Sequence, residues 1–262
     1  MNGLPFAKWE GLGNDFVIVD ARSGLEGDPA ALARAVCAPH FGVGADGLVL
    51  LRGNGQGLAM EIFNRDGSPA STCGNALRCL ALYVRREGVS QGSEVSFQTP
   101  SGLRRARFVS DEVEVDMGAP RGLSPEGLAS EPVPVEVSDG EGWGVSMGNP
   151  HLVVFVDRPV ELSQRGPYLQ QHGPLGEVNV EFTRVLSPTH LAVQVYERGA
   201  GATLACGSGA CAALAAAVAS GRTERAARVD LPGGSLQVTW AETMLMRGPA
   251  RELFRGIWRP DP

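Results

Sequence analysis

Short apolar runs recur along the whole chain and are separated by Gly, Pro, Asn and Asp. In the first half they read DFVIVD, GLVLL, AMEIFN and EVSFQT, and in the second HLVVFVD, HLAVQVYE, RVDLP and LQVTW. Such short, bounded runs predict strands. The longest helical candidate in each half follows a cysteine, in STCGNALRCLALYVRREG and TLACGSGACAALAAAVASG. The pattern predicts an α+β protein in which a sheet-rich domain around one central helix is built twice.

The two halves also resemble each other in sequence. Cys73 and Cys206 lie 133 residues apart, and the same offset places IFNRDG over VYERGA. Near the start of each half, GNDFVIVD resembles GNPHLVVFVD, with Asn14 and Asn149 offset by 135 residues. Three matches in the same order indicate an ancient duplication and two similar domains.

The stretch GAPRGLSPEGLASEPVPVEVSDGEG is rich in Pro, Gly and Ser, and it predicts the domain connection followed by a surface excursion. We therefore predict an N-terminal half over residues 1–117, joined by the C-terminal segment 251–262, and a C-terminal half over 118–250. The active site is expected in the cleft between the halves.

Composition narrows the class of protein. The chain has 262 residues, 43% hydrophobic and 20% charged, with a net charge of -6 and no long basic run, which argues against a nucleic-acid surface. No charge falls between Arg198 and Arg222, but this segment is mostly Ala and Gly, which favours a buried helix over a membrane span. No signal peptide is recognised, and five cysteines are an odd number. A cytoplasmic, reducing location is expected.

Cys73 and Cys206 each fall at the expected N-terminus of a central helix. Backbone N–H groups there lack partners and the helix dipole is positive, which stabilises a thiolate or a bound carboxylate. Gly74 and Gly207 follow directly and leave the amides accessible, and Asn75 and Ser208 add side-chain donors. Two such thiols on opposite faces of a substrate Cα could invert it, one removing a proton and the other returning one.

Other chemistries fit less well. Pyridoxal phosphate needs a Schiff-base lysine, and Lys8 is the only lysine in the chain. The cysteine spacings match neither zinc fingers nor a C-x-x-C redox pair, so no metal and no cofactor are expected. Cys37, Cys79 and Cys211 are interpreted as structural. GVGADG fits the dinucleotide-binding pattern, but a strand-like run follows it instead of a helix.

The chain resembles the diaminopimelate epimerase family along nearly its whole length. The segments that carry the resemblance are GLGNDF, GVGADG, FNRDGS, CGNALRC, MGNPH, VNVEF, YERGAG, ACGSGACA and DLPGGSL. The resemblance implies paired barrel-like, mostly antiparallel sheets around central helices, a homodimer, and cofactor-independent interconversion of LL- and meso-diaminopimelate for lysine and peptidoglycan precursors.

Matched by motif, the resemblance implies that Cys73 and Cys206 are the catalytic bases. Gly74, Asn75, Gly207 and Ser208 would hold the reacting carboxylate. The positions implied for the rest of the substrate are Asn14, Asn64, Asn149, Asn179, Glu197 and Arg198. Arg198 can bind a carboxylate in bidentate fashion, and Asn side chains both donate and accept. Glu197 and His151 are possible assisting groups for the cysteines.

Two positions depart from the family, and two alternatives stay open. Ala202 replaces an acid in RGAGAT, and Gly47 stands where some members carry glutamine. A sister racemase acting on proline or hydroxyproline would have less use for Arg198, Asn64 and Asn179. A thiol redox or peroxide-sensing protein would instead use a reversible disulfide between Cys73 and Cys206.

Overall fold

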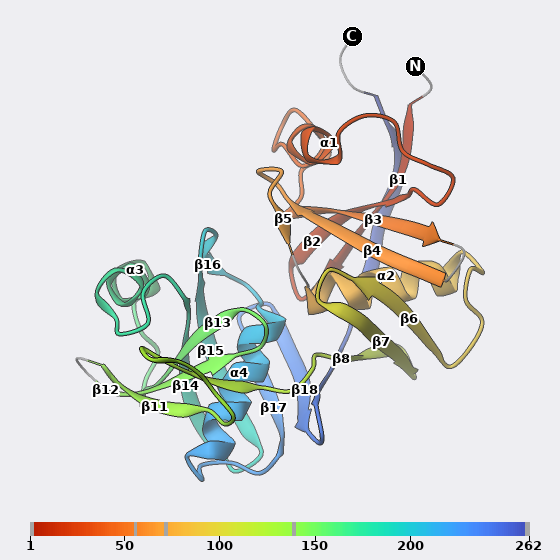
Figure 1. The fold of residues 1–262 in the computed structure, drawn as a ribbon. Coiled ribbons are helices and arrows are strands. Elements are labelled where there is room, and N and C mark those ends of the chain that lie inside the picture. Colours follow the sequence, from red (N-terminus) through yellow and green to blue (C-terminus); the bar gives the residue numbers. More distant parts are fainter. Residues whose placement is uncertain (1–2, 55–56, 71–72, 138–139, 260–262) are drawn as a thin grey trace. The chain divides into compact units, whose positions relative to one another are not determined.

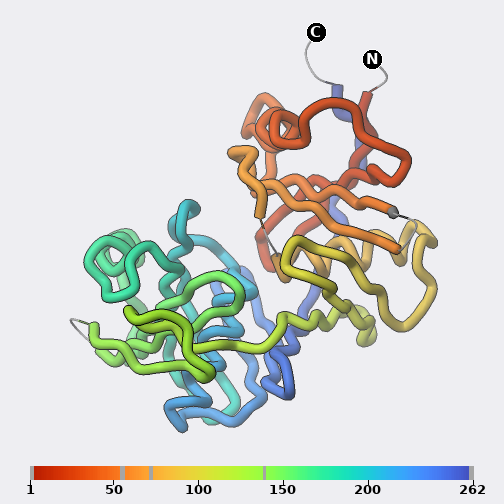
Figure 2. The backbone as a smooth tube through the Cα atoms, in the orientation of Figure 1, coloured from red at the N-terminus to blue at the C-terminus, as the bar shows by residue number. Residues whose placement is uncertain are grey.

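The structure is a computed structural model that describes residues 3–54, 57–70, 73–137 and 140–259. The chain divides into two compact units. The first comprises Met1–Val115 and Pro249–Pro262, and the second comprises Asp116–Gly248. In the first unit the last strand, coloured blue, returns to lie antiparallel to the first strand, coloured red (Figures 1 and 2).

From β1 to β8 in the first unit and from β12 to β19 in the second, strands and helices follow one another in the same order (Figure 1). The first unit contains β1 (Leu4–Gly11), β2 (Asn14–Asp20), α1 (Pro29–Val36), β3 (Gly47–Asn54), β4 (Gly57–Asn64), β5 (Pro69–Ala70), α2 (Gly74–Arg86), β6 (Glu94–Thr99), β7 (Gly102–Val109), β8 (Glu112–Asp116) and β20 (Arg251–Trp258). The second contains β9 (Arg121–Ser124), β10 (Gly127–Ala129), β11 (Val133–Val137), β12 (Gly140–Ser146), β13 (Pro150–Phe155), α3 (Leu162–His172), β14 (Asn179–Ser187), β15 (His190–Glu197), β16 (Gly201–Thr203), α4 (Gly207–Ala219), β17 (Ala226–Leu231), β18 (Gly234–Trp240) and β19 (Met244–Gly248).

Strand pairing repeats from one unit to the other. In the first, β1–β2, β3–β4, β4–β5, β6–β7 and β7–β8 are antiparallel, and β2–β3 and β4–β6 are parallel. In the second, β12–β13, β14–β15, β15–β16, β17–β18 and β18–β19 are antiparallel, and β13–β14 and β15–β17 are parallel. The predicted α+β class and internal duplication are therefore confirmed.

Each unit places one helix inside the sheet and one outside it. The inner helices, α2 and α4, are buried along nearly their whole length, and the alanines of α4 let strands approach it from several sides. The outer helices cover apolar strand faces: Ala33 and Val36 of α1 pack on β2 and β3, and Leu169 of α3 packs on β13 and β14. Alternating strand residues thus face two different helices.

Two features differ from the sequence expectations. The segment interpreted as a connection and surface excursion carries β9, β10 and β11, because its valines alternate and β11 pairs with β12. The outer helix α1 was not predicted, although Asp28 caps it through two backbone amides and Pro29 occupies its first turn. Within the part of the chain that the structure describes, no helix is long and apolar enough to cross a membrane.

Candidate active site

Both predicted catalytic cysteines cap the inner helix of their unit. Cys73 precedes α2 with φ -138° and ψ 115°, and Cys206 precedes α4 with φ -121° and ψ 112°. Each helix is 13 residues long and begins at the glycine after the cysteine. The extended cap backbone leaves the first-turn amides on the side of the thiol. In α4 the Gly209 N–H donates to Sγ of Cys206 at 3.4 Å.

Around Cys73 the structure brings together three of the predicted residues. Oδ1 of Asn14, at the start of β2, accepts from Nδ2 of Asn75 at 3.2 Å and lies 3.7 Å from Sγ of Cys73. Gly74 and Asn75 form the buried first turn of α2. Asn64 ends β4 and donates from Nδ2 to Oγ of Ser68 at 2.9 Å. Residues 71 and 72, which open the predicted segment, lie outside the described part of the chain.

A charged network behind Asn14 was missed at the sequence level. Oδ2 of Asp46 accepts from Nδ2 of Asn14 at 2.8 Å and from the backbone N–H of Asp15 at 3.1 Å. Asp15 in turn forms an ion pair with the buried Lys8, with an N–O distance of 2.5 Å. Asp46 lies in GVGADG, the motif that fails as a dinucleotide site. In this structure the loop orients an asparagine beside Cys73.

Around Cys206 the structure brings together a longer chain of polar groups. Oγ of Ser208 lies 3.5 Å from Sγ of Cys206 and accepts from Nδ2 of Asn149 at 3.3 Å. Oδ1 of Asn149 lies 3.1 Å from Nε2 of His151, whose Nδ1 lies 2.7 Å from Oε1 of Glu181. His151 and Glu181 are fully buried. Glu181 was missed, although VNVEF contains it.

The remaining predicted residues line the ends of β14 and β15. Asn179 donates from Nδ2 to the carbonyl of Pro150 at 3.1 Å, and its Oδ1 accepts from the backbone N–H of Arg198 at 3.0 Å. Arg198 itself is exposed. Oε1 of Glu197 accepts from Oγ1 of Thr203 at 2.5 Å. Ala202, which departs from the family, is an exposed residue of β16.

Burial and nearby acids control the protonation of Cys206. Burial raises the pKa of its thiol well above the usual value, and the carboxylates of Glu197 and Glu181 raise it further. Hydrogen bonds from Ser208 and the Gly209 amide act in the opposite direction. Burial also raises the pKa of Glu197, against the lowering effect of its bonds to Thr203 and Cys206. The resting Cys206 is therefore a protonated thiol.

All five cysteines are free thiols, and the three that were not predicted to be catalytic, Cys37, Cys79 and Cys211, are buried. Burial raises the pKa of Cys37 to about 12 and raises that of Cys79 further. Neither is suited to act as a nucleophile or a base near neutral pH. Among the described residues no group of three or more His, Cys, Asp or Glu side chains could hold a metal ion.

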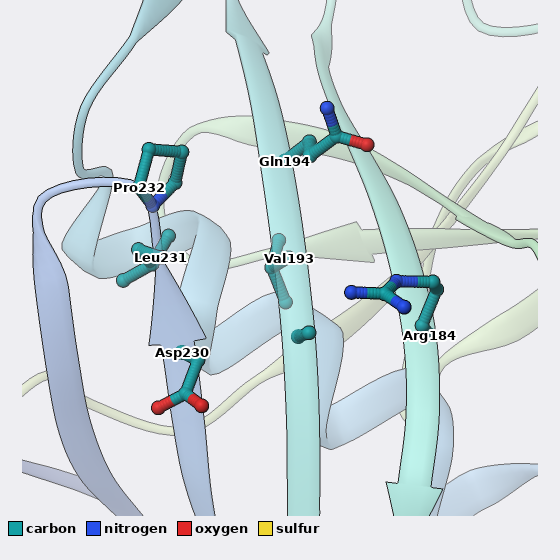
Figure 3. Close-up of a pocket in the computed structure, with 7 residues that line it drawn as sticks. Arg184, Val193, Gln194, Asp230, Leu231 and Pro232 are labelled. Carbon is teal, nitrogen blue, oxygen red and sulfur yellow. The ribbon is translucent and has the colours of Figure 1, made fainter. Parts of the chain in front are cut away.

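A shallow pocket lies elsewhere in the second unit, between β14, β15 and β17 (Figure 3). Arg184, Gln194 and Asp230 are among the residues that line it. It contains neither cysteine and none of the predicted site residues. This pocket is therefore separate from the side chains gathered around Cys206.

Comparison with known proteins shows the family of the chain. The family model described as Diaminopimelate epimerase matches residues 6–123 and 144–253. The chain belongs to the diaminopimelate epimerase family. A diaminopimelate epimerase of Desulforudis audaxviator (strain MP104C) is 47% identical, over 97% of this chain and 99% of that protein. One from Moorella thermoacetica (strain ATCC 39073 / JCM 9320) is 44% identical, over 98% of this chain and 100% of that protein.

Solved structures confirm the fold that is expected of a diaminopimelate epimerase family member. A probable proline racemase from Agrobacterium radiobacter K84 superposes with a TM-score of 0.74 at 14% identity, over 99% of this chain and 94% of that one. A predicted epimerase from Pseudomonas aeruginosa gives a TM-score of 0.70 at 18% identity, over 97% and 98%. Family membership confirms the resemblance drawn from the motifs and makes this chain an isomerase.

Proposed function

We propose that this protein interconverts LL- and meso-diaminopimelate, with Cys73 and Cys206 as its two bases. The observation that carries the proposal is the equivalent placement of two thiols at the N-caps of the two inner helices. A helix N-terminus favours both a thiolate and the carboxylate of an amino acid. The same first turn can therefore hold the substrate and activate the base.

In the proposed reaction the thiolate of one cysteine takes the proton from Cα. The C–H bonding pair is left on carbon and delocalises into the carboxylate as a carbanion. The thiol of the other cysteine then donates its proton to the opposite face of Cα, which forms the new C–H bond and inverts the centre. Backbone amides of both helices stabilise the charge that develops on the carboxylate. The protonated state of Cys206 suits it to donate when Cys73 is the base.

The resemblance to the diaminopimelate epimerase family supports the binding roles. Gly74, Asn75, Gly207 and Ser208 would hold the reacting carboxylate, and Asn14, Asn64, Asn149, Asn179, Glu197 and Arg198 would recognise the rest of the substrate. The exposed guanidinium of Arg198 suits a second carboxylate. The two units would act as the two domains of the enzyme, with the reacting carbon in a cleft between them. A cytoplasmic homodimer that serves lysine and peptidoglycan precursor synthesis completes the proposal.

Proton NMR of the reduced protein with LL-diaminopimelate in heavy water tests the reaction. We expect deuterium at Cα as the meso isomer accumulates, without added pyridoxal phosphate. No exchange with diaminopimelate, together with exchange on proline or hydroxyproline, would overturn the substrate assignment in favour of the sister racemases.

Single Cys73→Ala and Cys206→Ala variants test the two bases. Each is expected to lose roughly 10³-fold or more of the epimerisation rate, because removing a general base or acid typically costs that much. Cys211→Ala, in the same helix as Cys206, is the matched control. A fully active Cys73→Ala or Cys206→Ala variant would refute the two-base mechanism.

A further inference from the structure

The pair formed by His151 and Glu181 is an unusual feature of the second unit. In the parallel pairing of β13 and β14, His151 lies opposite Asn179, and Glu181 follows two residues later. Both side chains therefore lie on the same face of the sheet. That face meets α4, since a Cβ added to Gly209 would lie 2.7 Å from Oε1 of Glu181. The pair is thus buried against the helix that Cys206 caps.

The first unit shows that the fold does not need this pair. By the duplication, Phe16 and Val49 take the places of His151 and Glu181: Phe16 lies opposite Gly47 in the parallel β2–β3 pairing, and Val49 follows two residues later. Phe16 is 3% exposed and Val49 is fully buried. Buried charged pairs commonly stabilise a fold no better than apolar residues do. The fold can therefore be built without the pair, and its presence in the second unit calls for another reason.

The hydrogen bonds from Ser208 to Glu181 determine how many protons the His151–Glu181 pair carries. Nδ2 of Asn149 donates to Ser208, so Oδ1 faces His151 and Nε2 must carry a proton to donate to it. The contact between Nδ1 and Oε1 of Glu181, at 2.7 Å, then requires one more proton on either atom. Both distributions leave the pair with no net charge, which is what a fully buried site favours. Among the described residues, Oε2 of Glu181 has no donor, which adds to the cost of a lone carboxylate.

We infer that Glu181 and His151 share one proton as a net-neutral pair, and that Glu181 is a positioning residue for Asn149. The Nε2–H of His151 holds the amide oxygen, so the amide nitrogen faces Ser208 beside Cys206. An imidazole without the extra proton would accept at Nε2, and the amide of Asn149 would turn its oxygen toward Ser208. That orientation would present an acceptor, in place of a donor, next to the proposed carboxylate site. Cys206 and Glu197 are ionisable groups that interact with this pair.

Nitrogen-15 NMR of histidine-labelled full-length protein tests the shared proton directly, without substrate. His151 is assigned among the four histidines by its loss in His151→Phe. We expect Nε2 to carry a proton, as its contact with Oδ1 of Asn149 requires. In Glu181→Gln the shared proton is absent, so the single proton of the neutral imidazole is expected to divide between Nδ1 and Nε2. An unprotonated Nε2 in the wild-type protein would overturn the inference, whatever the substrate of the enzyme proves to be.

A transplant from the first unit separates positioning from stability. Gly209 corresponds to Ala76, so the triple variant His151→Phe, Glu181→Val, Gly209→Ala copies the side chains of the first unit into the second. The kinetic readout rests on the proposed function. We expect cooperative unfolding with a midpoint within a few degrees of wild type, and epimerisation reduced at least about 100-fold. A triple variant that is active, or one that is unfolded, would contradict the inference.

Two milder variants complete the test. Glu181→Gln is expected to raise KM about tenfold with a smaller change in kcat, because the donor end of Asn149 is no longer fixed. Asp230→Asn is the matched control, since Asp230 accepts from His190 at 2.7 Å in the same unit but lies outside the site. It should change neither kinetic constant more than twofold. A loss of stability in Glu181→Gln with unchanged KM and kcat would indicate a purely structural role.

Discussion

The helix caps of the two units have the same backbone but different surroundings. Cys73 is partly exposed and lies beside the amide of Asn14, which Asp46 holds in place. Cys206 is 5% exposed and is surrounded by Ser208 and the carboxylates that raise its pKa. A duplication thus preserved the position of the thiol and changed its electrostatic environment.

The difference suits a reaction that needs one acid and one base at a time. If the pKa values of both thiols were low, the resting enzyme would hold two thiolates and no proton to return. Raising the pKa of one thiol ensures that a proton is present on that side. The amide network around Cys73 provides hydrogen-bond donors and acceptors there. Variants near either cysteine can test this difference between the two thiols.

Glu197→Gln should have the largest effect. Glu197 corresponds to Asn64 in the first unit, and its carboxylate raises the pKa of the Cys206 thiol. Removing the charge lowers that pKa, so more thiolate forms at a given pH. We expect kcat to fall roughly 100-fold, by analogy with the loss of other general acid–base groups.

The pH dependence of Cys206 alkylation by iodoacetamide, followed by mass spectrometry, checks the cause of that loss. Its midpoint should move to lower pH in Glu197→Gln and stay in place in Glu177→Gln, whose exposed carboxylate is the control. An unchanged midpoint would mean that Glu197 acts on the substrate and not on the thiol.

Asp46→Ala should have a smaller effect, confined to the first unit. It removes the acceptor that holds Nδ2 of Asn14 and the backbone N–H of Asp15. Losing a hydrogen bond to a charged group costs about 1.5–3 kcal/mol where the partner stays unpaired. Since Asp46 is exposed, water replaces part of the loss, and we expect KM to rise about tenfold.

Steady-state kinetics of Asp46→Ala and of the control variant Asp20→Ala tests the expected rise in KM. Asp20 lies at the opposite end of the same strand, β2, from Asn14, and it pairs with Arg22. The control should retain the wild-type KM. Equal KM values in the two variants would show that Asp46 does not position Asn14.

The sequence was sufficient to predict the features that depend on local patterns. Short apolar runs between turn residues mark most of the strands, and glycine after each cysteine marks where the inner helices begin. The duplication is visible because Cys73 and Cys206 keep their flanking residues. These features need no knowledge of which strand lies beside which.

The missed residues depend on long-range register. Glu181 reaches His151 only because β13 and β14 run parallel, although the residues are 30 positions apart in sequence. Asp46 and Asn14 are 32 positions apart. In both cases the acid lies in a quoted motif, but periodicity alone cannot say which side chain it meets.

The smallest expected effect is that of Gly209→Ala on stability. It tests whether Gly209 is needed because the second unit has Glu181 and His151 where the first has apolar residues. A Cβ there would lie 2.7 Å from Oε1 of Glu181 and 3.3 Å from Cβ of Cys206, closer to the oxygen than packed atoms allow. Gly209→Ala should therefore lower the free energy of unfolding by about 1–3 kcal/mol, as overpacking does. In the His151→Phe, Glu181→Val background the oxygen is gone, and alanine should stabilise by up to about 1 kcal/mol through its helix propensity.

Urea unfolding of the four proteins in this cycle measures the coupling. A change of sign between the backgrounds would show that Gly209 is there to admit the Glu181 carboxylate, whereas the first unit has the buried Ala76 and Val49 at the corresponding positions. Equal effects in both backgrounds would instead assign Gly209 to the backbone of the helix cap. The acid beside Cys206 would then have been added to the second unit without a compensating change in its helix.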